Sequence, residues 1–540
     1  MTGAQAAVAA LAREGVGHVF SLPGTTLLPL YDALREQSEV RLVVARHEQG
    51  AAHMAEGYAR AGRRPGVCMA SRGPGAANLA LGMHNAYAAS SPVMAIVGSV
   101  STDIAGRDAF EEMDLLTFYR PVTKWAVEVG RADRVPEFVQ RGLRLSMLGR
   151  PRPVLVALPQ DVQQEKAPAR FLPEATPVRG PVPDPGDIDR ALALLAGARR
   201  PLILAGGGVT WAGAAERLAE LATATGIPVI ATHSRKENFP NDHPLFRGSI
   251  TGSSGAAPST VSMASEADVV LALGCRFSEF TTRRYKLFRQ STLIHVDIDP
   301  SEMGKVYTPA LGIVADLGAT IDALAKAVKA RGGPGPGGWD WSPEIEENYR
   351  QESTFSGPFP ESPIHPAHLV AALQDVLDRD ALLVSDSGSF RTWFDRYYRF
   401  RSGGFMAPGG GSMGFGFPAA LGAKVAQPDR QVVCLAGDGG ALMVFQELAT
   451  AVQYDLRVVL VVINNDSYGN VKNHQRKSYG GRYFGVDLVN PDFAALARSF
   501  GASGERVTEA SGLRPALLRA LNHRGPAVVE VAVDREKIQP

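Results

Sequence analysis

Short, fully apolar runs alternate with helix-like stretches along almost the whole chain, and this pattern limits the fold more than any other feature. Buried strands separated by helices are typical of parallel sheets that are covered on both faces. We therefore expect an α/β protein built from doubly wound parallel sheets. The twelve runs form three sets: HVFSL, RLVVA, GVCMAS and VMAIVG; PLILAG, PVIAT, DVVLALG and LIHVDID; ALLVSD, VVCLAG, VVLVVIN and AVVEVAV.

Two stretches interrupt the alternation. Residues 164–187 are rich in proline, and residues 331–362 begin with RGGPGPGG. Both have the composition of linkers. A chain of 540 residues also exceeds what a single hydrophobic core holds. We expect three domains, at residues 1–163, 188–330 and 363–537.

Composition excludes several classes of partner. The formal net charge is +1, so nothing indicates binding to nucleic acid or to an anionic membrane. No apolar run approaches the ~18 residues of a membrane span, and the amphipathic stretch from Ala4 to Glu14 lacks the features of a secretion signal. Cys68, Cys275 and Cys434 lie far apart in apolar runs, which predicts reduced, buried thiols in a cytoplasmic protein.

One carboxylate stands at the end of an apolar run. In QVVCLAGDGG, Asp438 lies between glycines directly after the run, and the next run ends at Asn464 and Asn465. Ligands of such sheets bind at the carboxyl ends of the strands, and consecutive parallel strands are usually neighbours. Asp438 and Asn465 are therefore expected to meet at one sheet edge. Their oxygens suit Mg²⁺ completed by phosphate oxygens. A plain strand and turn is the alternative.

The spacing resembles a known motif. Gly437-Asp438-Gly439 followed by Asn465, 27 residues after Asp438, is similar to the diphosphate–magnesium motif of thiamine diphosphate (ThDP) enzymes. Other stretches resemble the acetolactate synthase branch of that superfamily: RHEQGAAHMAEGYAR, RGPGAANL, GRPRPVLVALPQDV and GGGSMGFGFPAALGAK. The resemblance implies a pyrimidine-binding domain, a central Rossmann-like domain and a diphosphate-binding domain, in that order.

The resemblance also implies roles for single residues. Glu48 corresponds to the catalytic glutamate that contacts the pyrimidine, and Met413 to the apolar residue that holds the cofactor bent. Mg²⁺ would be bound by Asp438, Asn465 and the backbone carbonyl of Ser467. The implied cofactor-binding residues are Pro23, Gly24, Glu48, Asn78, Gly388, Ser389, Gly411, Met413, Gly437, Asp438, Gly439, Gly440, Asn465, Tyr468 and Gly469.

The substrate region departs from that family. A stretch resembling GMVxQW is expected after the asparagines, but GNVKNHQ stands there. The substrate residues expected from this region and its counterpart near residue 110 are Phe110, Glu111, Lys124, Asn470, Asn473 and His474. If Glu111 lies in the pocket, its charge would disfavour a second anionic acceptor, with Lys124 able to offset it. The run AGGGV at 205–209 favours a loop in a relic central domain over an FAD site.

The resemblance predicts a ThDP- and Mg²⁺-dependent carboligase that decarboxylates a 2-oxo acid, pyruvate being the best candidate, and transfers the acyl unit to an acceptor. Alternatives within the enzymes are a 2-oxo acid decarboxylase, a sulfoacetaldehyde acetyltransferase-like enzyme and a 2-hydroxyacyl-CoA lyase. The non-enzyme alternative is a nucleotide-binding or electron-transfer α/β protein. Because active sites in the family are shared between subunits, a homodimer or homotetramer is expected.

Overall fold

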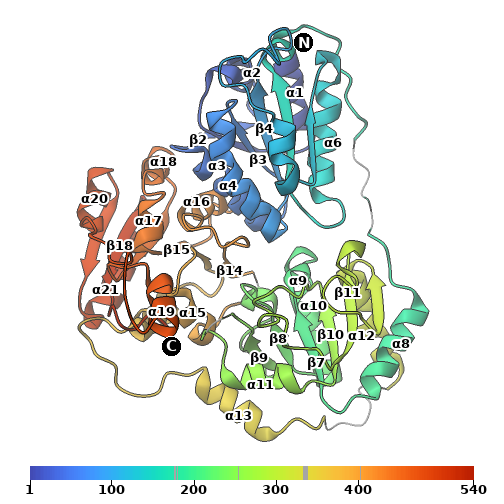
Figure 1. Cartoon of the computed structure of the whole chain (residues 1–540), viewed down its shortest axis with the longest axis vertical. Helices are drawn as coiled ribbons and strands as arrows, with labels where there is room; N and C mark the ends of the chain where they lie inside the picture. Colours follow the sequence, from blue (N-terminus) through green and yellow to red (C-terminus); the bar gives the residue numbers. More distant parts are fainter. Residues whose placement is uncertain (175–177, 179, 253, 333–338, 402) are drawn as a thin grey trace.

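The structure is a computed structural model that describes residues 1–174, 178, 180–252, 254–332, 339–401 and 403–540. Residues 175–177 and 333–338, which belong to the two expected linkers, lie outside the described residues. The described chain forms three α/β domains, each with a six-stranded parallel sheet between helices (Figure 1). The predicted fold class is confirmed.

The N-terminal domain contains the first sheet. Its strands lie in the order β2 (Arg41–Val44), β1 (His18–Ser21), β3 (Gly66–Ala70), β4 (Val93–Ser99), β6 (Val154–Pro159) and β5 (Trp125–Glu128). Its α-helices are α1 (Gly3–Arg13), α2 (Leu28–Glu36), α3 (Glu48–Gly62), α4 (Pro74–Ala89), α5 (Leu115–Tyr119), α6 (Val135–Met147) and α7 (Gln160–Gln164).

The C-terminal domain repeats this strand order. It runs β14 (Phe405–Met406), β13 (Leu382–Ser385), β15 (Val432–Gly437), β16 (Val458–Asn464), β18 (Ala527–Ala532) and β17 (Ser503–Val507). The chain winds outward in opposite directions from β13 and β15, and such a switch point opens a crevice beyond the strand ends. The α-helices are α14 (Pro366–Val376), α15 (Arg391–Tyr397), α16 (Gly416–Ala426), α17 (Asp438–Leu442), α18 (Glu447–Gln453), α19 (Gly469–Ser478), α20 (Phe493–Ser499) and α21 (Leu513–Asn522).

The central domain has a different strand order, that of dinucleotide-binding sheets. Its strands are β12 (Leu311–Val314), β11 (Thr292–Asp297), β10 (Val269–Leu273), β7 (Pro201–Ala205), β8 (Val229–Ala231) and β9 (Phe246–Ser249). Its α-helices are α8 (Pro185–Ala196), α9 (Gly207–Trp211), α10 (Ala215–Thr225), α11 (Pro258–Glu266) and α12 (Leu317–Ala330).

A further helix, α13 (Pro343–Glu352), lies within the second expected linker. It is attached to the central domain, because Tyr349 is buried edge-on against Phe246 with ring centroids 6.3 Å apart. Just before it, the indole N–H of Trp339 donates to the Thr225 carbonyl at 3.1 Å, and that of Trp341 to the Pro201 carbonyl at 3.0 Å. The stretch expected to be a plain linker is therefore partly a docked element.

The N- and C-terminal domains share one hydrophobic core, in which α3 packs against α16 (Figure 1). Glycines permit the close approach of these helices. A Cβ at Gly57 would lie 2.0 Å from the Ala419 carbonyl oxygen, and one at Gly422 would lie 1.9 Å from the Met54 carbonyl oxygen. Backbone cannot move aside as a flexible side chain can, so this contact requires glycine at both positions.

The three cysteines are free and buried, as predicted. Burial raises the pKa of the Cys275 thiol to about 12 and raises those of Cys68 and Cys434 as well. Within the described residues, no helix combines the length and apolar character needed to cross a bilayer.

Candidate functional site

The loops after β13, β15 and β16 line one cavity of about 1320 Å³, which we call the C-terminal cavity. It lies where the strand order switches, and β15 and β16 are paired neighbours, with Gly437 opposite Ile463. The predicted meeting of Asp438 and Asn465 at one sheet edge is thus confirmed. Predicted residues that line the cavity are Gly388, Ser389, Gly411, Met413, Gly437, Asp438, Gly439, Gly440, Asn465, Ser467, Tyr468, Gly469, Asn470, Asn473 and His474.

Asp438 is nearly inaccessible, and its carboxylate organises the loop after β16. One oxygen accepts the Gly439 N–H at 2.9 Å, and the other accepts the Ser467 N–H at 3.2 Å and the Asn490 side-chain amide at 2.8 Å. Burial raises the pKa of Asp438 above its usual range. A bound cation would offset the cost of burying this charge.

Asn464 and Asn465 have different environments. Asn464 donates to Glu530 at 2.9 Å and accepts the Asp466 N–H at 3.1 Å, so its amide is committed to the fold. The side chain of Asn465 lines the cavity and forms no hydrogen bond with any residue that the structure describes. Nearby, the hydroxyl of Ser467 is buried and has no hydrogen-bond partner among the described residues. These oxygens fit a hard cation better than a transition metal.

Asp386, directly after β13, shapes the loop that carries Met413. It is completely buried and accepts the N–H groups of Ser387 at 2.7 Å and Gly414 at 2.9 Å. Burial raises its pKa to about 6. Sequence reasoning did not single out Asp386 or Asn490. Asp386 carried a usable signal, because it ends an apolar run as Asp438 does.

Glu48 is the first residue of α3, in the N-terminal domain. Its carboxylate accepts a hydrogen bond from the Asn78 amide at 3.0 Å, and a Cβ at Gly75 would lie 3.2 Å from its other oxygen. Gly24, after β1, packs against Ser71, which in turn lies near Gly75. We call these residues, Gly24, Glu48, Gly75 and Asn78, the Glu48 cluster. Pro23 is exposed beside them.

The Glu48 cluster and the C-terminal cavity of the same chain lie at opposite ends of α4. Asn78 contacts Glu48 near the start of this helix, whereas His84 and Ala88 near its end line the cavity. At 1.5 Å per residue, the ten residues from Asn78 to Ala88 span about 15 Å. Among the described residues, none of the Glu48 cluster lines the cavity. Within one chain, the Glu48 cluster and the C-terminal cavity therefore do not face each other.

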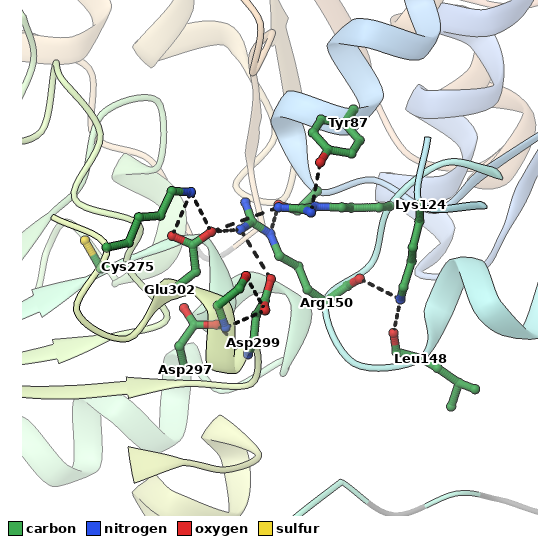
Figure 2. Close-up of polar contacts among 12 residues, drawn as sticks. Tyr87, Lys124, Leu148, Arg150, Cys275, Asp297, Asp299 and Glu302 are labelled. Atoms are coloured by element: carbon green, nitrogen blue, oxygen red, sulfur yellow. Dashed lines mark hydrogen bonds and ion pairs between the residues drawn. The ribbon is translucent and has the colours of Figure 1, made fainter. Parts of the chain in front are cut away.

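The expected substrate residues divide between the same two places. Asn470, Asn473 and His474 lie on α19 and line the cavity. Phe110 and Glu111 lie on the side of the Glu48 cluster, where Glu111 forms an ion pair with Arg72 at 3.4 Å. Lys124 lies with neither group: its ammonium donates to the carbonyls of Leu148 and Arg150, the latter at 3.1 Å, where the N-terminal and central domains meet (Figure 2).

A second cavity of about 250 Å³ lies between the central and N-terminal domains. Arg235 enters it beside Gly207 and donates to the Ala89 carbonyl at 3.1 Å. Arg150 of the N-terminal domain also lines this cavity and forms an ion pair with buried Glu302 of the central domain (Figure 2). The Arg150 guanidinium also donates to the Ser90 hydroxyl at 2.9 Å. These charged side chains join the two domains.

Comparison with known proteins covers nearly the whole chain. Three thiamine pyrophosphate enzyme domains match: the N-terminal TPP binding domain at residues 1–118, the central domain at 188–324 and the C-terminal TPP binding domain at 386–531.

Curated relatives match over comparable lengths. A probable acetolactate synthase large subunit of Methanocaldococcus jannaschii is 38% identical over 100% of this chain and 93% of its own length. The acetolactate synthase isozyme 2 large subunit of Escherichia coli is 35% identical over 100% of this chain and 97% of its own. An acetolactate synthase of Arthrospira platensis is 35% identical, with coverages of 99% and 95%.

Proposed function

This chain belongs to the thiamine pyrophosphate enzymes, among the acetolactate synthase large subunits, and we propose that it is a ThDP- and Mg²⁺-dependent carboligase that condenses pyruvate. The observation that carries the proposal is the pair of half-sites: the C-terminal cavity, lined by Asp438 and Asn465 of the C-terminal domain, and the Glu48 cluster of the N-terminal domain. A binder of nucleotides alone would need no such glutamate.

The residues of the C-terminal cavity fit the diphosphate and its metal. Asp438, Asn465 and the Ser467 carbonyl would hold Mg²⁺, and the loops at Gly388–Ser389 and Gly437–Gly440 would receive the diphosphate. A Cβ added at Gly439 would lie 2.6 Å from the ring of Tyr468. One added at Gly440 would lie 2.5 Å from the carboxylate of Asp386. Glycines therefore let the backbone form a cradle at this point.

When bound, ThDP supplies the carbanion chemistry that decarboxylates a 2-oxo acid. The protein positions the reacting groups. Glu48, oriented by Asn78, would hold a proton at the pyrimidine, and Met413, half-buried in the cavity, would support the bent cofactor. Asn470, Asn473 and His474 would contact the substrate from α19. Asn473 is already oriented, because its amide donates to Gln539 at 2.9 Å.

The opposite placement of the two half-sites supports a shared active site. A second copy of the chain would bring its Glu48 cluster to the C-terminal cavity of the first, and two such contacts complete a closed dimer. We propose a homodimer, or a homotetramer of two such dimers. The three buried, free thiols support a cytoplasmic location.

We propose that the central domain does not hold FAD. The cavity of about 250 Å³ is smaller than the ~300–1,000 Å³ of sites that take drug-sized ligands, and FAD exceeds such ligands. Arg235 lies over the glycine loop, its Nε 3.3 Å from a Cβ built at Gly207. The purified protein should lack flavin absorbance and should gain none after incubation with FAD and gel filtration.

The test of the function is direct. Wild-type protein with ThDP, Mg²⁺ and pyruvate should release CO₂ and form acetolactate, identified by mass spectrometry. Calorimetric titration should show Mg²⁺-dependent ThDP binding, which Asp438→Ala should abolish. Asp487→Asn, which changes an exposed carboxylate in the same region, is the matched control. Absence of acetolactate together with released acetaldehyde would instead assign a decarboxylase.

A further inference from the structure

Helix α18 of the C-terminal domain holds the segment that leads into Glu48. Glu447 and Thr450 lie on one face of the helix and Tyr454 follows at its end, a spacing that places all three on the same side. All three hydrogen-bond the backbone of the chain at Val44 or Arg46, about 400 positions earlier. Beside them, the Arg46 guanidinium donates to Gln453 at 2.6 Å.

The contacts are directed at backbone groups that the sheet leaves open. β2 is an edge strand that ends at Val44. The Val44 N–H donates to the Tyr454 hydroxyl at 2.9 Å, and its carbonyl accepts from Thr450 at 3.2 Å. Two residues on, the Arg46 N–H donates to both carboxylate oxygens of Glu447, at 3.0 and 3.1 Å. The chain is thus fixed from the strand end at Val44 as far as Arg46, two residues before Glu48.

Glu447 also reaches the first turn of α3. It is completely buried, and Thr450 donates to it at 2.8 Å. A Cβ at Gly50 would lie 2.2 Å from its carboxylate oxygen, so the carboxylate sits directly against the start of the helix. A negative charge there interacts favourably with the helix dipole. Glu447 therefore contacts the chain on both sides of Glu48.

We propose that Glu447 is a positioning residue for Glu48: its carboxylate fixes the turn from which the activating glutamate projects. This rests on the proposed function of Glu48. The contact of Glu447 with Arg46 connects the two half-sites within one chain, because Glu447 lies in the segment that directly follows Asp438. Each chain thereby builds its Glu48 cluster on its own diphosphate domain, even though that cluster would serve the cofactor of a second chain.

The experiment follows proton exchange at C2 of bound ThDP. In Glu447→Gln, Mg²⁺–ThDP affinity should stay within about two-fold of wild type, because the cavity is untouched. The rate of C2 hydrogen–deuterium exchange, measured by quenched-flow and NMR, should fall by about 10- to 100-fold, the cost of a displacement near 1 Å. kcat should fall in parallel, with KM for pyruvate unchanged.

A matched control separates positioning from general damage. Glu56 is as buried as Glu447 and lies on α3, the helix that Glu48 begins. Its carboxylate accepts hydrogen bonds from Asn85 at 2.7 Å and Ser91 at 3.2 Å, away from Glu48. Glu56→Gln should exchange C2 at the wild-type rate. In the Glu48→Gln background, adding Glu447→Gln should cause no further loss, because both changes act through one group.

The positioning role of Glu447 would be overturned if Glu447→Gln exchanged the C2 hydrogen of ThDP at the wild-type rate. It would also be overturned if adding Glu447→Gln to Glu48→Gln lowered the exchange rate by as much as Glu447→Gln does alone. If Glu447→Gln does not fold, Tyr454→Phe removes only the bond to the Val44 N–H and should give a smaller loss of the same kind; an unchanged rate there would also count against it. Failure of the wild type to bind ThDP would refute the proposed function instead.

Discussion

Glu111 forms an ion pair with Arg72 beside the Glu48 cluster, and this changes what its charge can do. Its carboxylate is half-buried, and its backbone carbonyl would be 2.6 Å from a Cβ at Gly73, at the start of α4. Arg72, rather than Lys124, is the cation that offsets it. The remaining repulsion toward an anionic acceptor is that of a partly screened surface charge.

Removing the charge of Glu111 should ease the binding of an anionic acceptor. Glu111→Gln should lower KM for pyruvate in acetolactate formation by up to about five-fold, because an interaction between charges at such a position is worth at most ~1 kcal/mol. Steady-state kinetics measures the change, and Glu128→Gln, at an exposed position in β5, is the control. An unchanged KM would show that Glu111 does not face the acceptor.

The buried carboxylate of Glu447 predicts a dependence of stability on pH. Burial raises its pKa from 4.5 to about 7. Because the folded pKa is the higher one, the contribution of this group to stability is complete below about pH 4.5 and is lost as the pH rises through 7. The thermal midpoint of Glu447→Gln should therefore rise relative to wild type between pH 5 and 8. A constant difference would contradict the raised pKa.

At the scale of elements, the contact of α3 with α16 depends on glycine. Gly57→Ala or Gly422→Ala would push a methyl group into backbone, so each should lower the unfolding midpoint, by an amount equivalent to about 1–3 kcal/mol of overpacking. Gly130→Ala is the control, since a Cβ there meets nothing within 4 Å. Denaturation followed by circular dichroism gives the comparison; equal midpoints for Gly57→Ala and Gly130→Ala would refute the argument.

The apolar runs predicted strands reliably where strands are buried on both faces, and all twelve are strands in the structure. Five strands that the pattern did not predict, β5, β9, β12, β14 and β17, lie at sheet edges. Burial is incomplete in β5, β12 and β17, whereas β9 and β14 are buried but short. β12 alternates buried and exposed residues, and β14 has only two residues. An edge strand needs no continuous apolar run, because one side meets solvent or a loop; β2 is also an edge strand but does carry a predicted run. β6, VLVALP, was not predicted either, although it is a buried apolar run that the same pattern could have identified.

The site was predictable only in part. The meeting of Asp438 with Asn465 follows from the pairing of consecutive parallel strands, which a sequence expresses directly. The contact of Glu447 with Arg46 joins residues 401 positions apart and depends on how two domains pack. The same holds for the pair of Glu111 with Arg72, since loop conformation decides it. No local pattern encodes such contacts, so the structure is needed to find them.

At the scale of the whole molecule, the opposed half-sites predict complementation between two inactive variants. Glu48→Gln and Asp438→Ala should each abolish activity in a pure dimer. In a mixed dimer, one active site receives both substituted residues, whereas the other receives the unchanged Glu48 of one chain and the unchanged Asp438 of its partner. Random mixing makes half of the dimers mixed, so an equimolar refolded mixture should recover about a quarter of wild-type activity. Each variant refolded alone is the control, and no recovery, or an active monomer by light scattering, would exclude a shared site.

The attachment of α13 also decides where this chain can be divided. Trp339, Trp341 and Tyr349 bind the second linker to the central domain. A central domain expressed alone, or exchanged with that of a relative, should therefore extend through Glu352. A boundary at residue 331 would leave three aromatic side chains without their pocket and open an apolar surface on the excised domain. Phe355 stacks on Tyr397 of the C-terminal domain, with ring centroids 4.1 Å apart, so for protein engineering the practical junction lies between Glu352 and Phe355.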